Sequence, residues 1–217
     1  MRNRIYAADV SVFSDRQLFD AVYARMPLYR QRKIDRFRFD KDKYLSLGAG
    51  ALLLKALENA DILYSRVFVS ENGRPDVGED FFFNLSHSGE LAVCAVSDRR
   101  VGIDTEIVRG FSDALARRVF SEKEIAFCRS FDDTDRVYTR MWTAKESIMK
   151  KTGEGLSLGA ENISLDTEGD RPVSASLIGT GDRFFLHNMS YEEYELTVCS
   201  EYGYFAEIEF CELKKMM

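Results

Sequence analysis

Several features are scarce or absent in this chain, and each absence excludes a class of protein. The 217 residues include only three prolines and no low-complexity linker, so no domain boundary stands out. No apolar run approaches the roughly 20 residues that span a bilayer. The opening stretch "MRNRIYAADV" lacks the apolar core of a signal peptide. We therefore expect a cytoplasmic protein that makes no membrane contact.

Cysteine and histidine are too few and too scattered for two further kinds of site. The four cysteines show neither C-x-x-C nor Cys/His spacing, and there are only two histidines. The sequence thus supports neither a zinc site nor a disulfide framework, and without an export signal the thiols should be reduced.

Positive charge is in deficit overall but concentrated locally. The net charge of −6 argues against a general nucleic-acid-binding protein. Residues 25–43, "RMPLYRQRKIDRFRFDKDK", nevertheless contain eight basic residues against three acidic ones. This stretch suits a small polyanion or one acidic partner, although a solvated helix face would look the same.

The pattern of apolar residues predicts an α+β fold with helices layered on sheets. We expect strands at 4–13 and 65–70, with a long buried helix at 43–60 between them. A strand, a polar break at 84–89 and a hairpin turning at 97–100 should follow, then helices at 112–120, 121–131 and 134–151. The rest reads as a meander of strands. If there are two halves, they meet near residue 107, giving 1–107 and 108–217.

A short acidic motif on a predicted strand offers a candidate metal site. Alternate residues of "VGIDTE" face opposite sides, so Asp104 and Glu106 share one side, about 7 Å apart at Cα. Two like charges so placed favour a compensating cation, and a hard divalent ion takes oxygen ligands. A solvent-facing strand surface is the alternative.

The helix expected at 134–151 carries charges on the side that it should bury. Its apolar arc consists of Met141, Trp142, Ile148 and Met149. Lys145 falls inside that arc, and Glu146 and Lys150 lie along its edge. Glu146 could supply a third carboxylate, with Lys150 near substrate phosphates and Lys145 reaching over the apolar surface into the same pocket. A surface Glu146–Lys150 pair would leave Lys145 unexplained.

Two polar stretches have both a functional and a structural interpretation. "NLSHSG" brings Ser86 and His87 to a predicted break between strands, where hydroxyl, amide and imidazole groups could bind phosphate or simply form a polar turn. "FSEKE" contains Ser121 and Glu124, which are spaced as a helix capping box. His187 has no comparable setting, and we interpret it as structural.

The order of these motifs resembles that of the 4′-phosphopantetheinyl transferases of the Sfp-like type. The matching stretches are "GRP" (73–75), "NLSHS" (84–88), "GIDTE" (102–106), "FSEKE" (120–124) and "WTAKESIMK" (142–150), followed by "GEGLSL". Each motif alone is weak, but the ordered set is specific. The resemblance implies a monomer of two similar helix-on-sheet halves related by a pseudo-two-fold axis.

The resemblance also implies an activity. Such an enzyme transfers the phosphopantetheine arm of coenzyme A to a serine of an apo acyl, polyketide or peptidyl carrier protein and releases adenosine 3′,5′-bisphosphate. By matching position, Asp104, Glu106 and Glu146 would hold Mg²⁺, or Mn²⁺, on the pyrophosphate. Lys150 would neutralise the departing phosphate, and Glu124 matches a glutamate proposed as the base.

The coenzyme A contacts follow from the same resemblance, with one departure. Leu45 stands where the family's helix carries an arginine that binds the 3′-phosphate. The residues expected to bind coenzyme A are therefore Arg74, Ser86, His87, Lys145 and Lys150, with Arg32, Lys33 and Arg36 in place of that arginine.

The carrier should dock on a basic rim with apolar anchors, because carrier domains are acidic around their serine. The residues expected at this rim are Arg109, Phe111, Leu115, Arg117 and Arg118. Two other functions remain open: a Mg²⁺-dependent phosphohydrolase or nucleotidyl transferase with the same carboxylates, and a non-catalytic coenzyme A or carrier-binding protein. A missing metal carboxylate would favour the last, and all three are present.

Overall fold

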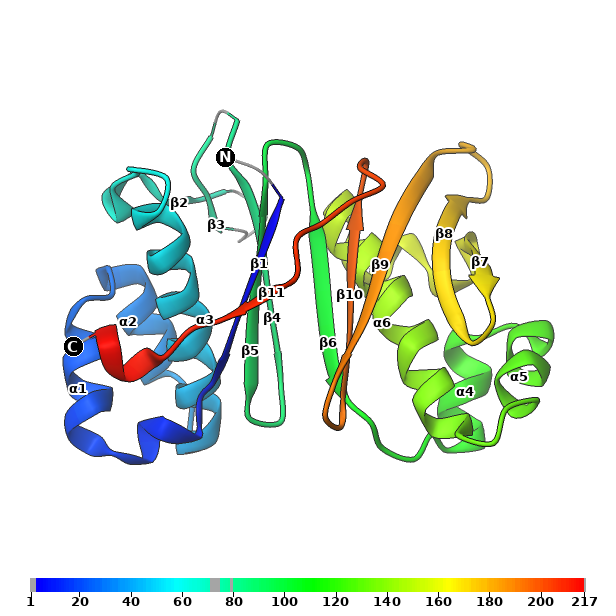
Figure 1. The fold of residues 1–217 in the computed structure, drawn as a ribbon, viewed down its shortest axis with the longest axis horizontal. Helices are drawn as coiled ribbons and strands as arrows, with labels where there is room; N and C mark the ends of the chain where they lie inside the picture. Colours follow the sequence, from blue (N-terminus) through cyan, green and yellow to red (C-terminus); the bar gives the residue numbers. More distant parts are fainter. Residues whose placement is uncertain (1–2, 71–74, 79, 217) are drawn as a thin grey trace. The chain divides into compact units, whose positions relative to one another are not determined.

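The computed structural model describes residues 3–70, 75–78 and 80–216, which form two compact units (Figure 1). Unit 1 comprises Met1–Arg99 and Ala206–Met217, and unit 2 comprises Arg100–Phe205. The observed boundary lies before strand β6 (Gly102–Ile107), whereas the sequence placed it after residue 107. The reason is that β6 hydrogen-bonds to β10 (Tyr194–Ser200), which holds it in unit 2.

Unit 1 packs helices on one face of a four-stranded sheet (Figure 1). The strands lie in the order β11-β1-β5-β4, and only β11 runs parallel to its neighbour β1. They span β1 (Arg4–Asp9), β4 (Phe82–Ser88), β5 (Leu91–Ser97) and β11 (Ile208–Phe210); the helices span α1 (Arg16–Ala24), α2 (Leu28–Asp35) and α3 (Asp40–Glu58). Shorter elements are η1 (Ser11–Ser14), η2 (Tyr64–Arg66), β2 (Phe68–Val69), β3 (Pro75–Asp76) and η5 (Leu213–Met216).

Unit 2 repeats this layering with an antiparallel sheet of order β6-β10-β9-β8-β7. The remaining strands are β7 (Ile163–Glu168), β8 (Arg171–Leu177) and β9 (Arg183–Tyr191), and the helices are α4 (Asp113–Val119), α5 (Glu122–Arg129) and α6 (Thr134–Thr152). Two short 3-10 turns, η3 (Gly155–Leu158) and η4 (Ala160–Asn162), lead from α6 into β7. The α+β class and the helix-on-sheet layering predicted from the sequence are therefore confirmed.

Three local predictions were wrong. The stretch at 84–89 is not a break, because Asn84 to Ser88 lie inside β4, which pairs with β5 through a tight turn at Gly89 and Glu90. No hairpin forms at 97–100, since β5 and β6 belong to different sheets. The last predicted meander strand instead joins β1 in unit 1. In the last two cases strand pairing over long sequence distances decided the outcome, which local patterns do not encode. In the first case the turn lies at the end of the polar stretch, so the strand continues through the rest of it.

The long helices match their sequence signals. Helix α6 ends at Gly153, whose φ of 82° is left-handed and suits glycine. Helix α5 begins with the predicted capping box of Ser121 and Glu124. Within the described ranges, no helix is both long and apolar enough to cross a membrane.

Candidate active site

A glycine brings β6 directly against the backbone of α6. A Cβ added to Gly102 would lie 1.9 Å from the carbonyl oxygen of Ser147 and 2.7 Å from the backbone nitrogen of Lys151. Only a residue without a side chain allows this approach. Because strand residues alternate, Asp104 and Glu106 point to the same side as Gly102, toward α6. Their cross-strand partners on β10, Thr197 and Glu195, both bond to side chains of α6, which confirms the prediction that Asp104 and Glu106 share a face.

Charged residues of α6 meet these carboxylates. The Nζ atom of Lys150 donates to Oδ1 of Asp104 at 2.6 Å, and the Asp104 side chain is only 5% exposed. Burial, followed by the negative charge of Asp104, raises the pKa of Glu146; Lys150 opposes the rise and Glu106 adds to it. Asp104, Glu106 and Glu146, hereafter the carboxylate set, are therefore close enough to act on one another electrostatically.

The donor chemistry of the carboxylate set suits a hard divalent ion, because all of its donors are oxygens and like charges so placed need a cation. As the side chains stand, however, no three His, Cys, Asp or Glu residues in the described ranges are grouped to hold a metal. Asp104 instead accepts the Lys150 ammonium. This contact involves Oδ1, one of the two carboxylate oxygens of Asp104.

The buried side of α6 is joined to β10 by polar pairs. Glu195, which is fully buried, accepts from Nε of Arg140 at 3.0 Å and from Nη1 of Arg136 at 2.6 Å. One turn further along α6, the hydroxyls of Thr143 and Thr197 are 2.9 Å apart. Arg140 also pairs with Asp170 and with Ser190 of β9. These contacts, hereafter the α6–β10 ladder, fix the register and rotation of the helix that carries Glu146 and Lys150.

Lys145 lies where the helical arc predicted, but its ammonium does not reach a surface. The residue is 0% exposed, and its Nζ atom donates to Glu124 at 2.8 Å, to the Ala160 carbonyl at 2.9 Å and to the Val119 carbonyl at 3.3 Å. The same Glu124 carboxylate accepts from the backbone nitrogen and hydroxyl of Ser121. The sequence interpretation that Lys145 delivers its charge to an open pocket therefore differs from what is observed.

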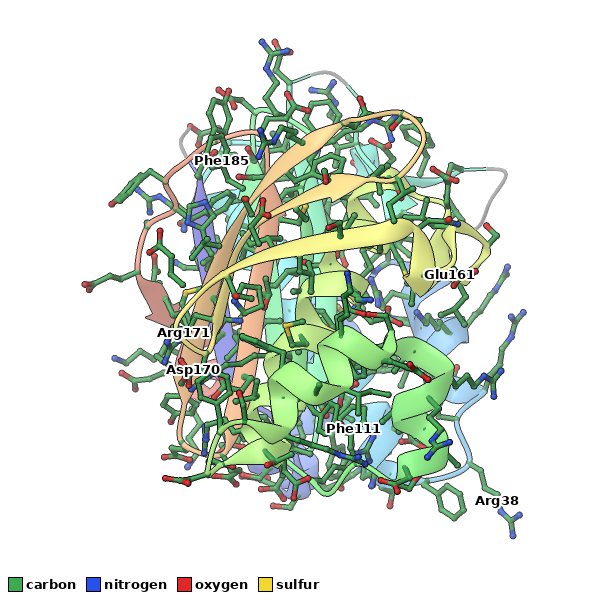
Figure 2. The ribbon with its side chains drawn as sticks, turned by 90° about the vertical axis from the view of Figure 1, so that its right-hand side faces the viewer. Arg38, Phe111, Glu161, Asp170, Arg171 and Phe185 are labelled. Carbon is green, nitrogen blue, oxygen red and sulfur yellow. The ribbon has the colours of Figure 1, made fainter. Side chains whose placement is uncertain are left out.

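The segment expected to dock the carrier is only partly an exposed rim. Arg109, Arg117 and Arg118 are exposed, and Leu115 keeps 45% of its surface. Phe111 is instead half-buried, because its ring stacks on Tyr138 at a centroid distance of 5.3 Å; Figure 2 labels it beside the helices of unit 2.

A pocket of about 410 Å³ lies at the junction of α4 and α5. We call residues 117–124 the elbow and this hollow the elbow pocket. Basic, acidic and apolar side chains line it, including Arg117, Lys123, Glu124, Glu161 and Ile178; Glu161 is labelled in Figure 2. The Glu124 side chain is 18% exposed here.

In unit 1 the basic helix α2 borders two adjoining hollows of about 350 and 160 Å³. The predicted residues Arg32, Lys33 and Arg36 all line the larger one. Arg30 lines both, is only 3% exposed, and its Nε atom is buried without a hydrogen-bond partner in the part of the chain that the structure describes. We call these hollows the basic pocket. An anion is the ligand that such a donor set favours.

Other predicted phosphate contacts divide around this pocket. His87 lines it, whereas Ser86, its neighbour on β4, is buried and does not. Arg74 lies outside the described residues. Leu45, which stands where the family carries an arginine, packs in the core of unit 1.

Lys33 shows the electrostatic cost of the basic pocket. Although Lys33 as a whole is exposed, partial desolvation of its ammonium, followed by the nearby positive charge of Arg30, lowers its pKa from the ordinary value of 10.5. A pocket that disfavours its own positive charge is one that an anion would stabilise.

Two remaining predictions concern residues outside these sites. Burial raises the pKa of the Cys128 thiol to about 12, and it also raises that of Cys199. Neither thiol is therefore poised as a nucleophile. His187 bonds the Tyr202 carbonyl at 2.9 Å and lies beside the Phe205 ring, which agrees with a structural role.

Sequence reasoning missed Arg30 and Glu195. Arg30 stood within the basic stretch, and its position next to Ile34 on the helical face offered a weak signal, since both are buried. Glu195 precedes an apolar strand core in "YELTVCS", and only the pairing of β10 with β6 and α6 reveals its partners.

Comparison with known proteins gives a consistent result. Residues 100–199 match the model of the 4′-phosphopantetheinyl transferase superfamily. A 4′-phosphopantetheinyl transferase of Bacillus subtilis is 31% identical over 217 residues, covering 93% of this chain and 93% of that protein. The 4′-phosphopantetheinyl transferase Sfp of Bacillus subtilis strain 168 is 28% identical over 190 residues, covering 82% and 83%.

One solved structure, that of Thermotoga maritima holo-[acyl-carrier-protein] synthase, aligns with a TM-score of 0.39 at 20% identity, over 46% of this chain and 60% of that one. The full-length similarity to the first Bacillus protein, together with the family match over the carboxylate set and α6, decides the assignment: this chain belongs to the 4′-phosphopantetheinyl transferase family.

Proposed function

We propose that the protein transfers the 4′-phosphopantetheine arm of coenzyme A to a serine of an apo acyl, polyketide or peptidyl carrier protein and releases adenosine 3′,5′-bisphosphate. One arrangement supports this most strongly. Gly102 allows β6 to pack closely against α6. Asp104 is therefore buried beside Lys150, and its negative charge raises the pKa of Glu146. Phosphoryl transfer asks a protein mainly for such positioning and charge stabilisation.

The carboxylate set is the proposed magnesium site, with Mn²⁺ as an alternative ion. When bound, the ion would neutralise charge on the coenzyme A pyrophosphate. Lys150 has two alternative positions in this proposal. It neutralises Asp104 in the free protein, and once released it contributes a point charge to the phosphate that leaves. Glu146, at the edge of α6, completes the set.

The basic pocket is the proposed site for the phosphates of the coenzyme A nucleotide. Arg30, Lys33 and His87 line its smaller hollow, and Arg32 and Arg36 line the larger one. Five cationic or ionisable side chains around one cavity suit a ligand that carries several negative charges. A phosphate bound beside Lys33 would raise the pKa of its ammonium back toward the ordinary value.

Carrier docking is proposed along α4, with the serine directed toward Glu124. That carboxylate, partly accessible in the elbow pocket, would accept the serine proton directly or through water. Exchanging both Arg117 and Arg118 for Glu should raise the carrier KM and leave coenzyme A affinity unchanged, because both guanidinium groups are exposed on the docking side. Equal losses for the two substrates would contradict this docking site.

The decisive assay mixes the protein with coenzyme A, MgCl₂ and apo carrier domains from fatty-acid, polyketide and peptide synthesis, and weighs each carrier by mass spectrometry. A phosphopantetheine adduct on at least one carrier is expected. If coenzyme A is hydrolysed without a carrier, the phosphohydrolase alternative holds. Tight binding with no product would instead indicate a non-catalytic protein.

A single substitution tests the metal assignment. Glu146→Ala should remove most activity while the protein remains folded, because the residue is only partly buried and no ion pair of the α6–β10 ladder depends on it. Near-wild-type turnover by a folded variant would exclude Glu146 from the metal site. Circular dichroism and thermal melting provide the folding control.

A further inference from the structure

One ammonium joins four segments of unit 2. Lys145 extends from the middle of α6, and its three acceptors belong to the end of α4, the first turn of α5 and η4. An ammonium group has three hydrogens. With Val119, Glu124 and Ala160 as acceptors and no exposed surface, it has no donor left for a phosphate.

Two of these contacts restrain the ends of helices. Val119 is the last residue of α4, so its carbonyl is among those that have no partner within the helix. Glu124 closes the capping box at the start of α5 and therefore links Lys145 to the backbone nitrogen of Ser121. Both sides of the elbow are thus attached to α6 through the same nitrogen atom.

The elbow in turn carries the groups that the carrier would meet. Arg117, Arg118 and Glu124 all line the elbow pocket. Lys145 and Glu146 are consecutive residues of α6, so the helix that holds the elbow also carries a member of the carboxylate set. A shift of the elbow would move the docking side chains and Glu124 while leaving the basic pocket, in unit 1, untouched.

We propose that Lys145 is a positioning residue that holds the elbow against α6, so that it governs the use of the carrier protein and not the binding of coenzyme A. This rests on the proposed function, and it departs from the coenzyme A contact that the family resemblance implies for the same lysine. The two roles differ in which substrate is affected.

The chain offers a matched control on the same helix. Lys151 is also buried, at 5% exposed, also pairs with a glutamate, and also lies over an aromatic ring: its Nζ is 5.0 Å from the Phe184 centroid, against 5.4 Å from Phe120 for Lys145. Among the described residues, its ion pair and its ring contact are both made outside the elbow. Lys145→Met and Lys151→Met therefore each remove a buried ammonium, its glutamate pair and its ring contact, but only Lys145→Met also removes contacts with the Val119 and Ala160 carbonyls.

The test compares the two variants in three measurements. Lys145→Met should lower kcat/KM for the carrier on the order of 100-fold, the scale expected when a reacting group is misplaced. Its Kd for coenzyme A, measured by calorimetry, should match the wild type. Amide hydrogen exchange within residues 113–124 should accelerate. Lys151→Met should leave carrier kinetics and exchange in the elbow unchanged, even where it lowers Tm.

The outcomes separate the alternatives. A fall in coenzyme A affinity as large as the fall in carrier kcat/KM would overturn the proposal and make Lys145 a ligand. Unchanged carrier kinetics with a lower Tm would also overturn it. If Lys145→Met does not fold, Lys145→Gln, which keeps two amide donors, should show the same pattern more weakly. Hydrogen exchange does not depend on activity. A wild-type protein that fails the transferase assay would therefore contradict the proposed function, whereas unchanged exchange in the elbow of Lys145→Met would contradict the positioning role.

Discussion

The two units solve the same packing problem with different side chains. Each lays a 19-residue helix, α3 or α6, across a sheet. Apart from Ser46, the buried residues of α3 are aliphatic or glycine. Helix α6 instead buries Thr139, Arg140, Thr143, Lys145, Ser147 and Lys151.

The difference shows that buried polar pairs specify the register and rotation of a helix, whereas apolar contacts mainly hold it against its neighbours. An apolar face is stabilised by any neighbour of suitable shape, so it specifies position loosely. A buried polar group that loses its partner costs about 1–3 kcal/mol, and a buried charge costs more. The α6–β10 ladder therefore penalises every register but one, in the unit whose helix carries Glu146 and Lys150.

Removing one member of the ladder should have the largest effect. Glu195→Met removes the buried carboxylate that pairs with Arg140 and Arg136 and leaves Arg140 with the partly exposed Asp170 as its anionic partner, so we expect a loss of about 3–5 kcal/mol in the free energy of unfolding. Leu53→Met, the comparison in α3, should cost about 1 kcal/mol or less. Urea titrations measure both. The double variant Arg140→Met/Glu195→Met should recover much of the loss, and equal costs for Glu195→Met and Leu53→Met would remove the contrast between the helices.

Substitutions at two glycines, one in each unit, should have effects of intermediate size on stability. Gly102→Ala would force a methyl group against the Ser147 carbonyl, and such overpacking costs about 1–3 kcal/mol. Gly48→Ala in α3 would also overpack, against Cγ1 of the buried Val10 at 2.3 Å, but this clash is with a side chain of unit 1 and is offset in part by about 1 kcal/mol of helix propensity.

Only Gly102→Ala should lower kcat, because it moves Asp104 away from α6. Thermal melts and steady-state kinetics on both variants provide the measurement. If Gly48→Ala loses as much activity as Gly102→Ala, close seating of β6 has no special role in the reaction.

The smallest effect should have the opposite sign. Lys33→Met in α2 removes an ammonium group whose pKa is lowered by desolvation and by Arg30. The free protein should therefore become slightly more stable at pH 7, while its affinity for coenzyme A should fall. In the wild type, the unfolded chain holds the Lys33 proton more tightly. Stability should therefore rise with pH between the lowered value and 10.5, and this rise should weaken in the variant.

Denaturant titrations at several pH values measure that slope, with Arg38→Met on the exposed side of the same stretch as the control. A Lys33→Met protein that is less stable than the wild type at every pH would show that the ammonium is satisfied in the free state.

Features that depend on residues close together in the sequence could be predicted, and features that depend on distant residues could not. The capping box at Ser121, the left-handed stop at Gly153 and the shared face of Asp104 and Glu106 depend on neighbours within a few residues, and all are observed. The destination of β11 and the partners of Glu195 depend on pairing across large stretches of chain, which no local period encodes.

Lys145 lies between these extremes. Helical spacing correctly placed it on the buried arc. Its partners come from three other segments, so its role as a cross-link inside unit 2 could not be read from spacing.

The parallel pairing of β11 with β1 has a consequence for synthesis. Parallel neighbours need a long crossover, and here the whole of unit 2 lies between them in the chain. A ribosome would thus deliver every residue of unit 2 before the strand that completes the edge of the first sheet. The unit that is begun first is finished last, and a nascent chain halted near residue 205 would have one complete unit and one that is still missing a strand.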